Sequence, residues 1–162
     1  MLTQPTPPDA GSSQYPRVGG FAQWLGIEIV GWDAGGPHLA LPVREAFINR
    51  NGSVHGGVLL TLLDSACSLA GVSCEKARLV GRVTAVSITA NFIAPVSRGT
   101  LHARAALRGG GRRIVLVDGE IRDDDGKLVA TGSGVIRRID DQNRGDGASA
   151  LDTQALSEEK TT

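Results

Sequence analysis

The order of apolar and polar residues divides the chain into a central segment able to form a core and two polar ends. Residues 1–16 are rich in proline, serine and threonine, and residues 140–162 hold no aromatic residue and few large aliphatic ones. Segments of this composition bury too little apolar surface to offset the entropy lost on ordering. We therefore predict a disordered N-terminal segment at 1–16, one folded domain at 17–139 and a disordered polar tail at 140–162.

Within the predicted domain, alternating apolar and polar residues indicate strands, and turn residues mark their ends. Residues 82–93 alternate in this way and are followed by Pro95, which cannot donate to a sheet. The predicted strands are 28–33, 38–43, 82–93, 99–107, 114–122 and 128–139, with a short helical turn at 21–26 and a loop at 44–54. The last four strands are joined by short connections, so we expect a mainly antiparallel sheet in an α+β fold.

One long helix is predicted between the second and third strands, over residues 54–74. At 100° per residue, one face carries apolar side chains: Val58, Leu59, Leu62, Ala66 and Leu69. The opposite face carries Asp64 among small or uncharged residues: Gly57, Leu60, Thr61, Ser68 and Gly71. A solvated face would normally carry several charges, so these residues suggest that another surface, such as a second subunit, approaches the helix here.

Composition excludes several classes of protein. The net charge is zero and the pI is near 6.8, which argues against nucleic-acid binding. Cys67 and Cys74 fall seven residues apart in the predicted helix, too far for a disulfide, and with three scattered histidines they predict no metal site. The N-terminal residues have no apolar signal core, and Asp64 interrupts the one apolar stretch, so we expect a cytoplasmic protein without a membrane span.

The residues that suggest chemistry stand at the start of the predicted helix. His55-Gly56-Gly57 places two glycines there, followed by Asp64 nine residues after the histidine. Backbone N–H groups at a helix start, supported by the helix dipole, can hold a carbonyl oxygen as it becomes negative. A carboxylate on the same helix could direct water at that carbonyl. Together these features point to hydrolysis of an acyl group.

These motifs resemble those of the hotdog-fold acyl-CoA thioesterases of the PaaI-like type, within the 4-hydroxybenzoyl-CoA thioesterase superfamily. The similarity rests on Asn49 six residues before His55, the two glycines, and Asp64 nine residues after that histidine. It continues through residues 83–84, 91–95, 99 and 111–113 and covers roughly residues 25–139. It implies a hotdog fold, in which a curved sheet wraps one long helix, and a homodimer or homotetramer whose active sites lie between subunits.

Carried over by position, the resemblance implies four catalytic residues. The Gly56 N–H would polarise the thioester carbonyl, and Asp64 of a partner subunit would act as general base or as nucleophile. Asn49 would orient the water or the substrate, and His55 would shape the oxyanion end of the site. The substrate would be an acyl- or aryl-acyl-CoA, CoA being part of the substrate, with no further cofactor and no metal.

Four more residues are candidates for substrate binding. Gly57 adjoins the oxyanion position, and Arg112 and Arg113 could hold CoA phosphates because guanidinium pairs well with phosphate oxygens. Ser133, beside a strand glycine, could lie close to the pantetheine arm. Candidates to line an acyl tunnel are Leu59, Leu60, Leu63 and Phe92.

Structural explanations stay open for the same residues. His55 could only cap the helix, the glycine pair could serve close packing, Asn49 could be a loop residue, and Asp64 could sit on a wet face. The arginines could be a solvated hairpin end. Two other functions also stay open: a non-catalytic acyl-CoA-binding protein, and a hydratase or dehydratase with His55 as base. The sequence leaves undecided the acyl group, the pathway, and whether the protein is a dimer or a tetramer.

Overall fold

The computed structural model describes residues 15, 17–75 and 78–139 of the chain. The predicted disordered segments, 1–16 and 140–162, lie outside these residues except for Tyr15, which packs against the core. The elements follow in the order α1 (Gly20–Leu25), β1 (Glu28–Asp33), β2 (Gly36–Pro42), η1 (Glu45–Phe47), α2 (Gly56–Ala70), β3 (Ser73–Glu75), β4 (Arg78–Val80), β5 (Arg82–Phe92), β6 (Thr100–Gly110), β7 (Ile114–Arg122) and β8 (Leu128–Ile139).

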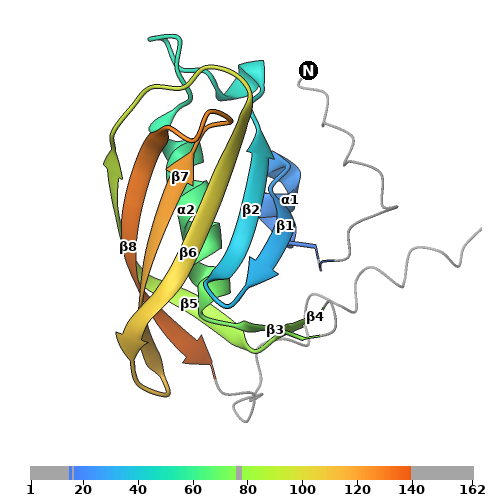
Figure 1. Cartoon of the computed structure of the whole chain (residues 1–162), viewed down its shortest axis with the longest axis vertical. Helices are drawn as coiled ribbons and strands as arrows, with labels where there is room; N and C mark the ends of the chain where they lie inside the picture. The colour runs from blue at the N-terminus through green and yellow to red at the C-terminus, as the bar shows by residue number, and fades with distance from the viewer. Residues whose placement is uncertain (1–14, 16, 76–77, 140–162) are drawn as a thin grey trace, which may run out of the picture.

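Six strands form one antiparallel sheet in the order β1-β2-β6-β7-β8-β5. The sheet curves around α2, which lies along its inner face (Figure 1). This confirms the predicted α+β fold of one long helix wrapped by a mainly antiparallel sheet. All six predicted strands are present, because period-two alternation marks strands that bury one face and expose the other.

The predicted helix is too long at its C-terminal end. α2 ends at Ala70, and Ser73–Glu75 instead forms the strand β3, which pairs with β4 in a small hairpin. The Arg138 Nε donates to the Gly71 carbonyl at 2.9 Å, which ties the chain at the point where the helix stops. Cys74 therefore lies on a strand, so the spacing argument that placed both cysteines on one helix was wrong.

The start of the predicted helix is also corrected. Val54 is not helical, because its N–H donates to the Val96 carbonyl at 2.8 Å and it forms a bridge with Ile48. The predicted loop 44–54 contains the short helix η1. Of the residues that the structure describes, no helix is long and apolar enough to cross a membrane.

The buried stripe of α2 is wider than predicted, because the sheet curves around the helix. Leu63 and Cys67 are fully buried in addition to the expected Leu59, Leu62 and Ala66, whereas Val58 and Leu69 are half-buried. Asp64 is also half-buried, on the opposite face as predicted. The Cys67 thiol packs in the core, where burial first, then Asp64 and Asp118, raises its pKa to about 12.

Two strand glycines allow α2 to lie close to the sheet. A Cβ added at Gly132 would lie 3.3 Å from the Leu63 Cδ1, and one at Gly119 would lie 3.1 Å from the Cys67 Sγ. Side chains at these positions of β7 and β8 would push the helix outward. Leu63 therefore fills space that the glycines leave in the centre of the sheet.

We predict that Leu63→Ala lowers the free energy of unfolding by about 2–5 kcal/mol, because it leaves a cavity that the rigid sheet cannot fill. Leu60→Ala on the same helix is the matched control: Leu60 is 39% exposed, and its truncation should cost less than half as much. Urea unfolding of both variants measures the difference. Equal losses would contradict the packing described for α2.

Candidate active site

The backbone N–H groups in the first turn of α2 differ in whether they have a hydrogen-bond acceptor. His55 is the N-cap, and its Nδ1 accepts a hydrogen bond from the Gly57 N–H at 2.9 Å. The Val58 N–H donates to the His55 carbonyl at 2.9 Å. The Gly56 N–H makes no hydrogen bond with any described part of the chain. One donor at the positive end of the helix is therefore left for a ligand.

Gly56 lines a hollow of about 330 Å³ at the start of α2. The hollow is mostly apolar, and nine residues line it: Asn49, Ser53, Val54, Gly56, Leu59, Phe92, Ile93, Ala94 and Pro95. Of the predicted tunnel residues, Leu59 and Phe92 line it, whereas Leu63 belongs to the core and Leu60 faces outward.

Sequence reasoning gave no role to Ser53 or to Ile93, Ala94 and Pro95. The signal that could have found Ile93, Ala94 and Pro95 was the family resemblance, which continues through residues 91–95.

Asn49 holds together the loop that precedes the helix. Its side-chain Oδ1 accepts hydrogen bonds from the Asn51 N–H at 2.8 Å and the Ser53 N–H at 3.4 Å. Its Nδ2 donates to the Ser53 Oγ at 3.3 Å. The structure thus brings Asn49 into the hollow with Gly56, and it gives the Asn49 side chain a structural task in this loop.

The loop is anchored at its other end by Arg44. Its guanidinium donates to the Leu25 carbonyl at the end of α1 and lies 4.5 Å from the centre of the Phe47 ring. The His55 N–H then donates to the Phe47 carbonyl at 2.8 Å. These contacts fix the position of the N-cap relative to α1.

Asp64 lies elsewhere on the helix. It is eight residues beyond Gly56, which places it about 12 Å further along the helix axis. Burial raises the pKa of its carboxyl above the ordinary value, and a hydrogen bond from the Ser68 hydroxyl partly opposes that rise. The structure therefore shows a half-buried carboxylate that is not in the hollow of its own chain.

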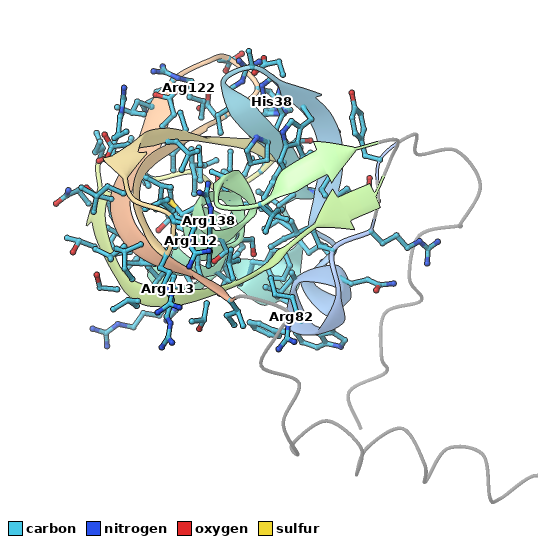
Figure 2. All side chains as sticks on the ribbon, turned by 90° about the horizontal axis from the view of Figure 1, so that it is seen from below. His38, Arg82, Arg112, Arg113, Arg122 and Arg138 are labelled. Carbon is cyan, nitrogen blue, oxygen red and sulfur yellow. The ribbon has the colours of Figure 1, made fainter. Side chains whose placement is uncertain are left out.

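The predicted phosphate ligands Arg112 and Arg113 lie at the opposite end of the molecule from Gly56. They form the turn between β6 and β7, close to where α2 ends (Figures 1 and 2). The Arg113 carbonyl accepts a hydrogen bond from the Arg138 N–H at 2.8 Å, and Arg138 reaches the end of the helix at Gly71. Within one chain, these arginines and the Gly56 donor are not brought together.

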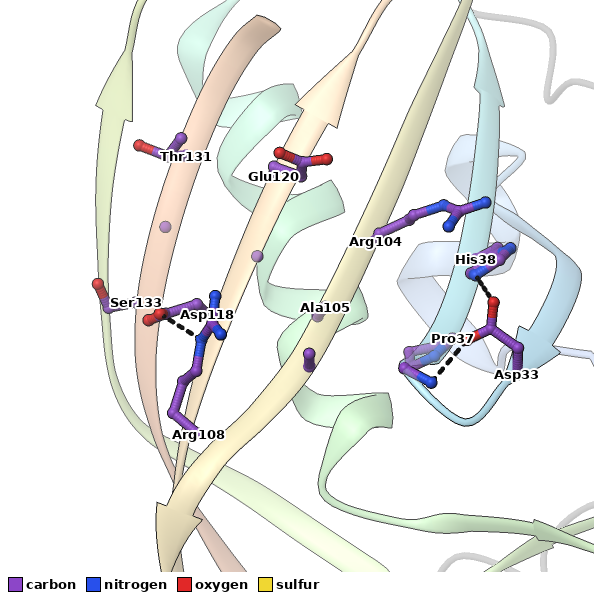
Figure 3. A pocket seen from close by; sticks show the side chains of 14 residues that line it. Asp33, Pro37, His38, Arg104, Ala105, Arg108, Asp118, Glu120, Thr131 and Ser133 are labelled. Atoms are coloured by element: carbon purple, nitrogen blue, oxygen red, sulfur yellow. Dashed lines mark hydrogen bonds and ion pairs between the residues drawn. The ribbon is translucent and has the colours of Figure 1, made fainter.

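Ser133 lies on the outer face of the sheet, away from α2. It lines a second hollow of about 560 Å³, whose walls carry charged side chains (Figure 3). Most of these charges are paired with each other: Arg108 with Asp118 at 2.8 Å, and His38 with Asp33 at 3.0 Å. The sheet separates this hollow from Gly56.

In the part of the chain that the structure describes, no group of three or more His, Cys, Asp or Glu residues could hold a metal ion.

Comparison with known proteins places this geometry in a family. The profile of the Thioesterase superfamily matches residues 51–130, the stretch that carries His55, Gly56 and Asp64. The acyl-coenzyme A thioesterase PaaI of Escherichia coli is 34% identical over 119 residues, which cover 73% of this chain and 81% of PaaI. This chain belongs to the thioesterase superfamily.

Solved structures agree with that assignment. A thioesterase from Haemophilus influenzae superposes with a TM-score of 0.67 at 29% identity, covering 75% of this chain and 84% of that one. The E. coli PaaI protein of the phenylacetic acid degradation operon gives a TM-score of 0.64 at 32% identity, covering 74% and 83%. The predicted PaaI-like resemblance, the hotdog fold and the class of thioester hydrolase are confirmed.

In this thioesterase-superfamily chain, the cap that His55 provides can be tested by stability alone. We expect His55→Ala to lower the free energy of unfolding by about 1 kcal/mol, because the Gly57 N–H loses its acceptor. His55→Asp should retain most of the stability, since aspartate is a favourable N-cap. Thermal or urea unfolding gives the comparison. If alanine and aspartate destabilise the protein equally, the imidazole does not act as the cap.

Proposed function

We propose that this protein is an acyl-CoA thioesterase that hydrolyses an acyl- or aryl-acyl-CoA to the free acid and CoA. The Gly56 N–H holds the thioester carbonyl, and Asp64 of a second copy of the chain acts on the carbonyl carbon. The protein works in the cytoplasm as a homodimer or homotetramer, without a metal or a further cofactor. Asn49 and His55 maintain the loop and the helix start that present Gly56.

The observation that carries this proposal is the Gly56 N–H at the start of α2, which has no partner among the residues that the structure describes. A thioester carbonyl that accepts from the Gly56 N–H becomes more electrophilic, and the same hydrogen bond stabilises the negative oxygen formed on attack. The mostly apolar hollow beside the donor suits an acyl group. His55 already occupies the neighbouring Gly57 N–H, so the carbonyl has one backbone donor to accept from in this turn.

The distance between Gly56 and Asp64 supports the second copy. Gly56 and Asp64 of one chain are about 12 Å apart along the helix axis, too far for both to contact one carbonyl group. The outer edge of β5 is available for the assembly: β5 pairs with β8, and no other described strand pairs with its second edge. A long unpaired edge is a natural site for adding a strand of another chain.

Antiparallel pairing of two β5 edges reverses the direction of the second copy. The end of that copy where its α2 finishes then comes beside the end of this chain where Gly56 lies. Asp64 of the second copy approaches the hollow from its own helix. Arg112 and Arg113 of the second copy lie on the same side, where they can pair with the phosphates of CoA.

Two routes complete the hydrolysis. As a general base, Asp64 takes a proton from water while the water oxygen bonds to the carbonyl carbon; the C–S bond then breaks and CoA leaves as the thiolate. As a nucleophile, Asp64 displaces the thiolate and forms an anhydride, which water hydrolyses to regenerate the carboxylate. Both routes place negative charge on the oxygen that Gly56 holds.

The position of His55 argues against the hydratase alternative. A base that removes a proton from carbon needs an unoccupied nitrogen lone pair, and the Nδ1 lone pair of His55 already accepts from the Gly57 N–H. A neutral imidazole then carries its proton on Nε2. The non-catalytic binder gains no support from Asp64, since a half-buried carboxylate near a carbonyl would be costly without a chemical role.

Replacing Gly56 tests the oxyanion donor directly. Gly56→Pro removes the N–H, and proline is tolerated at the first helical position. His55, with φ −61° and ψ 135°, already has the extended conformation that proline requires of the residue before it. Gly56→Ala adds a Cβ at the same point and keeps the N–H. We expect kcat for release of CoA thiol, measured on a panel of short, long and aryl acyl-CoAs, to be about 10²–10³-fold lower in the proline variant than in the alanine variant.

Equal rates in the two Gly56 variants would remove the N–H from the mechanism. Wild-type protein that binds acyl-CoA and releases no thiol would establish the binding function in place of hydrolysis.

The pH profile tests Asp64. The ionised carboxylate is the active form, so activity is lost as pH falls through its pKa, and the raised pKa places this loss above the ordinary aspartate range of about 4. The Ser68 hydroxyl lowers the pKa, so Ser68→Ala should move the acid limb of kcat/KM to higher pH. Ser68→Thr, which keeps a hydroxyl, should stay near wild type. If the acid limb of the kcat/KM profile stays in place or moves to lower pH in Ser68→Ala, the hydrogen bond from Ser68 does not tune a catalytic Asp64.

A further inference from the structure

The ring of Phe92 spans the gap between the sheet and the start of α2. A Cβ added at Gly56 would lie 3.3 Å from the Phe92 Cε2 and Cζ and 3.7 Å from its Cε1, and these three ring atoms would be its nearest neighbours. The far edge of the ring therefore rests against the residue that carries the unpaired N–H. Glycine at this position leaves room for the ring.

The backbone of Phe92 is held in place. Phe92 is the last residue of β5 and pairs with Ala130 of β8, and the following Ile93 N–H donates to the Val129 carbonyl at 2.8 Å. Only rotation about the side-chain bonds can move the ring. Its position beside Gly56 is thus set by the register of β5 on β8.

Phe92 remains 55% exposed although it lines the hollow. An aromatic side chain in this state gains free energy when an apolar group covers it. The groups around it in the hollow, Leu59 and the 93–95 segment, are apolar as well. An apolar group that enters beside the Gly56 donor would cover the ring, and this is where the acyl group of the proposed substrate lies.

The Phe92 ring lies close to the nitrogen that would hold the reacting carbonyl. A carbonyl oxygen hydrogen-bonded to the Gly56 nitrogen lies about 3 Å from it, and the carbonyl carbon about 4 Å from it. The ring edge lies at most about 6 Å from the same nitrogen, given the 3.3 Å contact and ordinary bond lengths. Because Gly56 and Phe92 line the same hollow, an acyl chain that enters it from the carbonyl held by Gly56 passes the ring at its first carbons.

We propose that Phe92 sets the width of the acyl pocket next to the reacting carbonyl, so that the enzyme selects acyl groups unbranched at that carbon and rejects branched ones. This inference rests on the proposed thioesterase function. Phe92 acts as a specificity-determining residue: it contacts the acyl chain and takes no part in proton transfer.

The test compares two thioesters of the same size, butyryl-CoA and isobutyryl-CoA. We expect wild type to prefer butyryl-CoA, and Phe92→Ala to raise the isobutyryl-to-butyryl ratio of kcat/KM by about tenfold or more, the usual effect of room for one methyl group. Phe92→Leu, which is the milder change, should give a smaller shift in the same direction. Leu116→Ala is the matched control, because Leu116 is 49% exposed on β7 and lies outside the hollow; its ratio should equal that of wild type.

A second measurement separates this inference from the proposed reaction. Dissociation constants of both thioesters are measured by calorimetry in Asp64→Ala, with and without Phe92→Ala. If wild type binds the thioesters without cleaving them, the hydrolytic function fails, and a shift in the binding ratio still supports the role of Phe92. The inference would be overturned if the isobutyryl-to-butyryl ratio were unchanged in both assays. It would also be overturned if Phe92→Ala and Phe92→Leu lost assembly without a change in that ratio, because the ring would then serve packing. Binding of neither thioester would overturn both proposals.

Discussion

The site depends on how the first turn of α2 distributes its backbone donors. Every helix begins with N–H groups that lack a partner within the helix. Here the His55 side chain accepts from Gly57, and the His55 carbonyl accepts from Val58. Within the described part of the chain, Gly56 is the residue of this turn that keeps a donor for a ligand. The Asn49 loop, anchored to α1 through Arg44, holds that residue in position. The histidine cap thus stabilises the helix start. It also leaves the Gly56 N–H as the donor at the positive end of the helix dipole that a ligand can use.

The length of the helix imposes the second constraint. Gly56 and Asp64 lie on the same helix, about 12 Å apart along its axis. No side-chain rotation within one chain therefore brings both to one carbonyl group. The proposed antiparallel pair of β5 edges meets this constraint by placing two helices in opposite directions. It also explains why the face around Asp64 is almost without charge and why Arg112 and Arg113 stand at the end of the chain opposite Gly56. On this account the separation of these groups within one chain follows from a site shared between two.

The sequence predicted the strands well because each buries one face, and the alternation of residues such as those at 114–122 records that burial directly. It overestimated the helix because Ser73–Glu75 pairs with Arg78–Val80, a contact that local pattern does not reveal. The spacing of the motif singled out Gly56, His55 and Asn49, and the structure brings Gly56 and Asn49 to one hollow with His55 as the N-cap beside them. The sequence could not show that the Gly57 N–H is occupied, that Asn49 holds its own loop, or that Phe92 rests against Gly56, since these facts depend on hydrogen bonds and packing between distant segments. Ser133 was predicted to lie near the pantetheine arm; which face of the sheet it occupies follows from the register of β8 and could not be predicted.

The central claim is that each site takes Gly56 from one chain and Asp64 from another, and complementation between two inactive variants tests it most directly. Gly56→Pro and Asp64→Ala are produced together in equal amounts and assayed for release of CoA thiol, beside each variant alone. Random assembly gives one intact site in every mixed pair, so the account predicts about a quarter of wild-type activity from the mixture and almost none from either variant. A mixture as inactive as its components, in assemblies shown by their tags to contain both chains, would contradict the shared site.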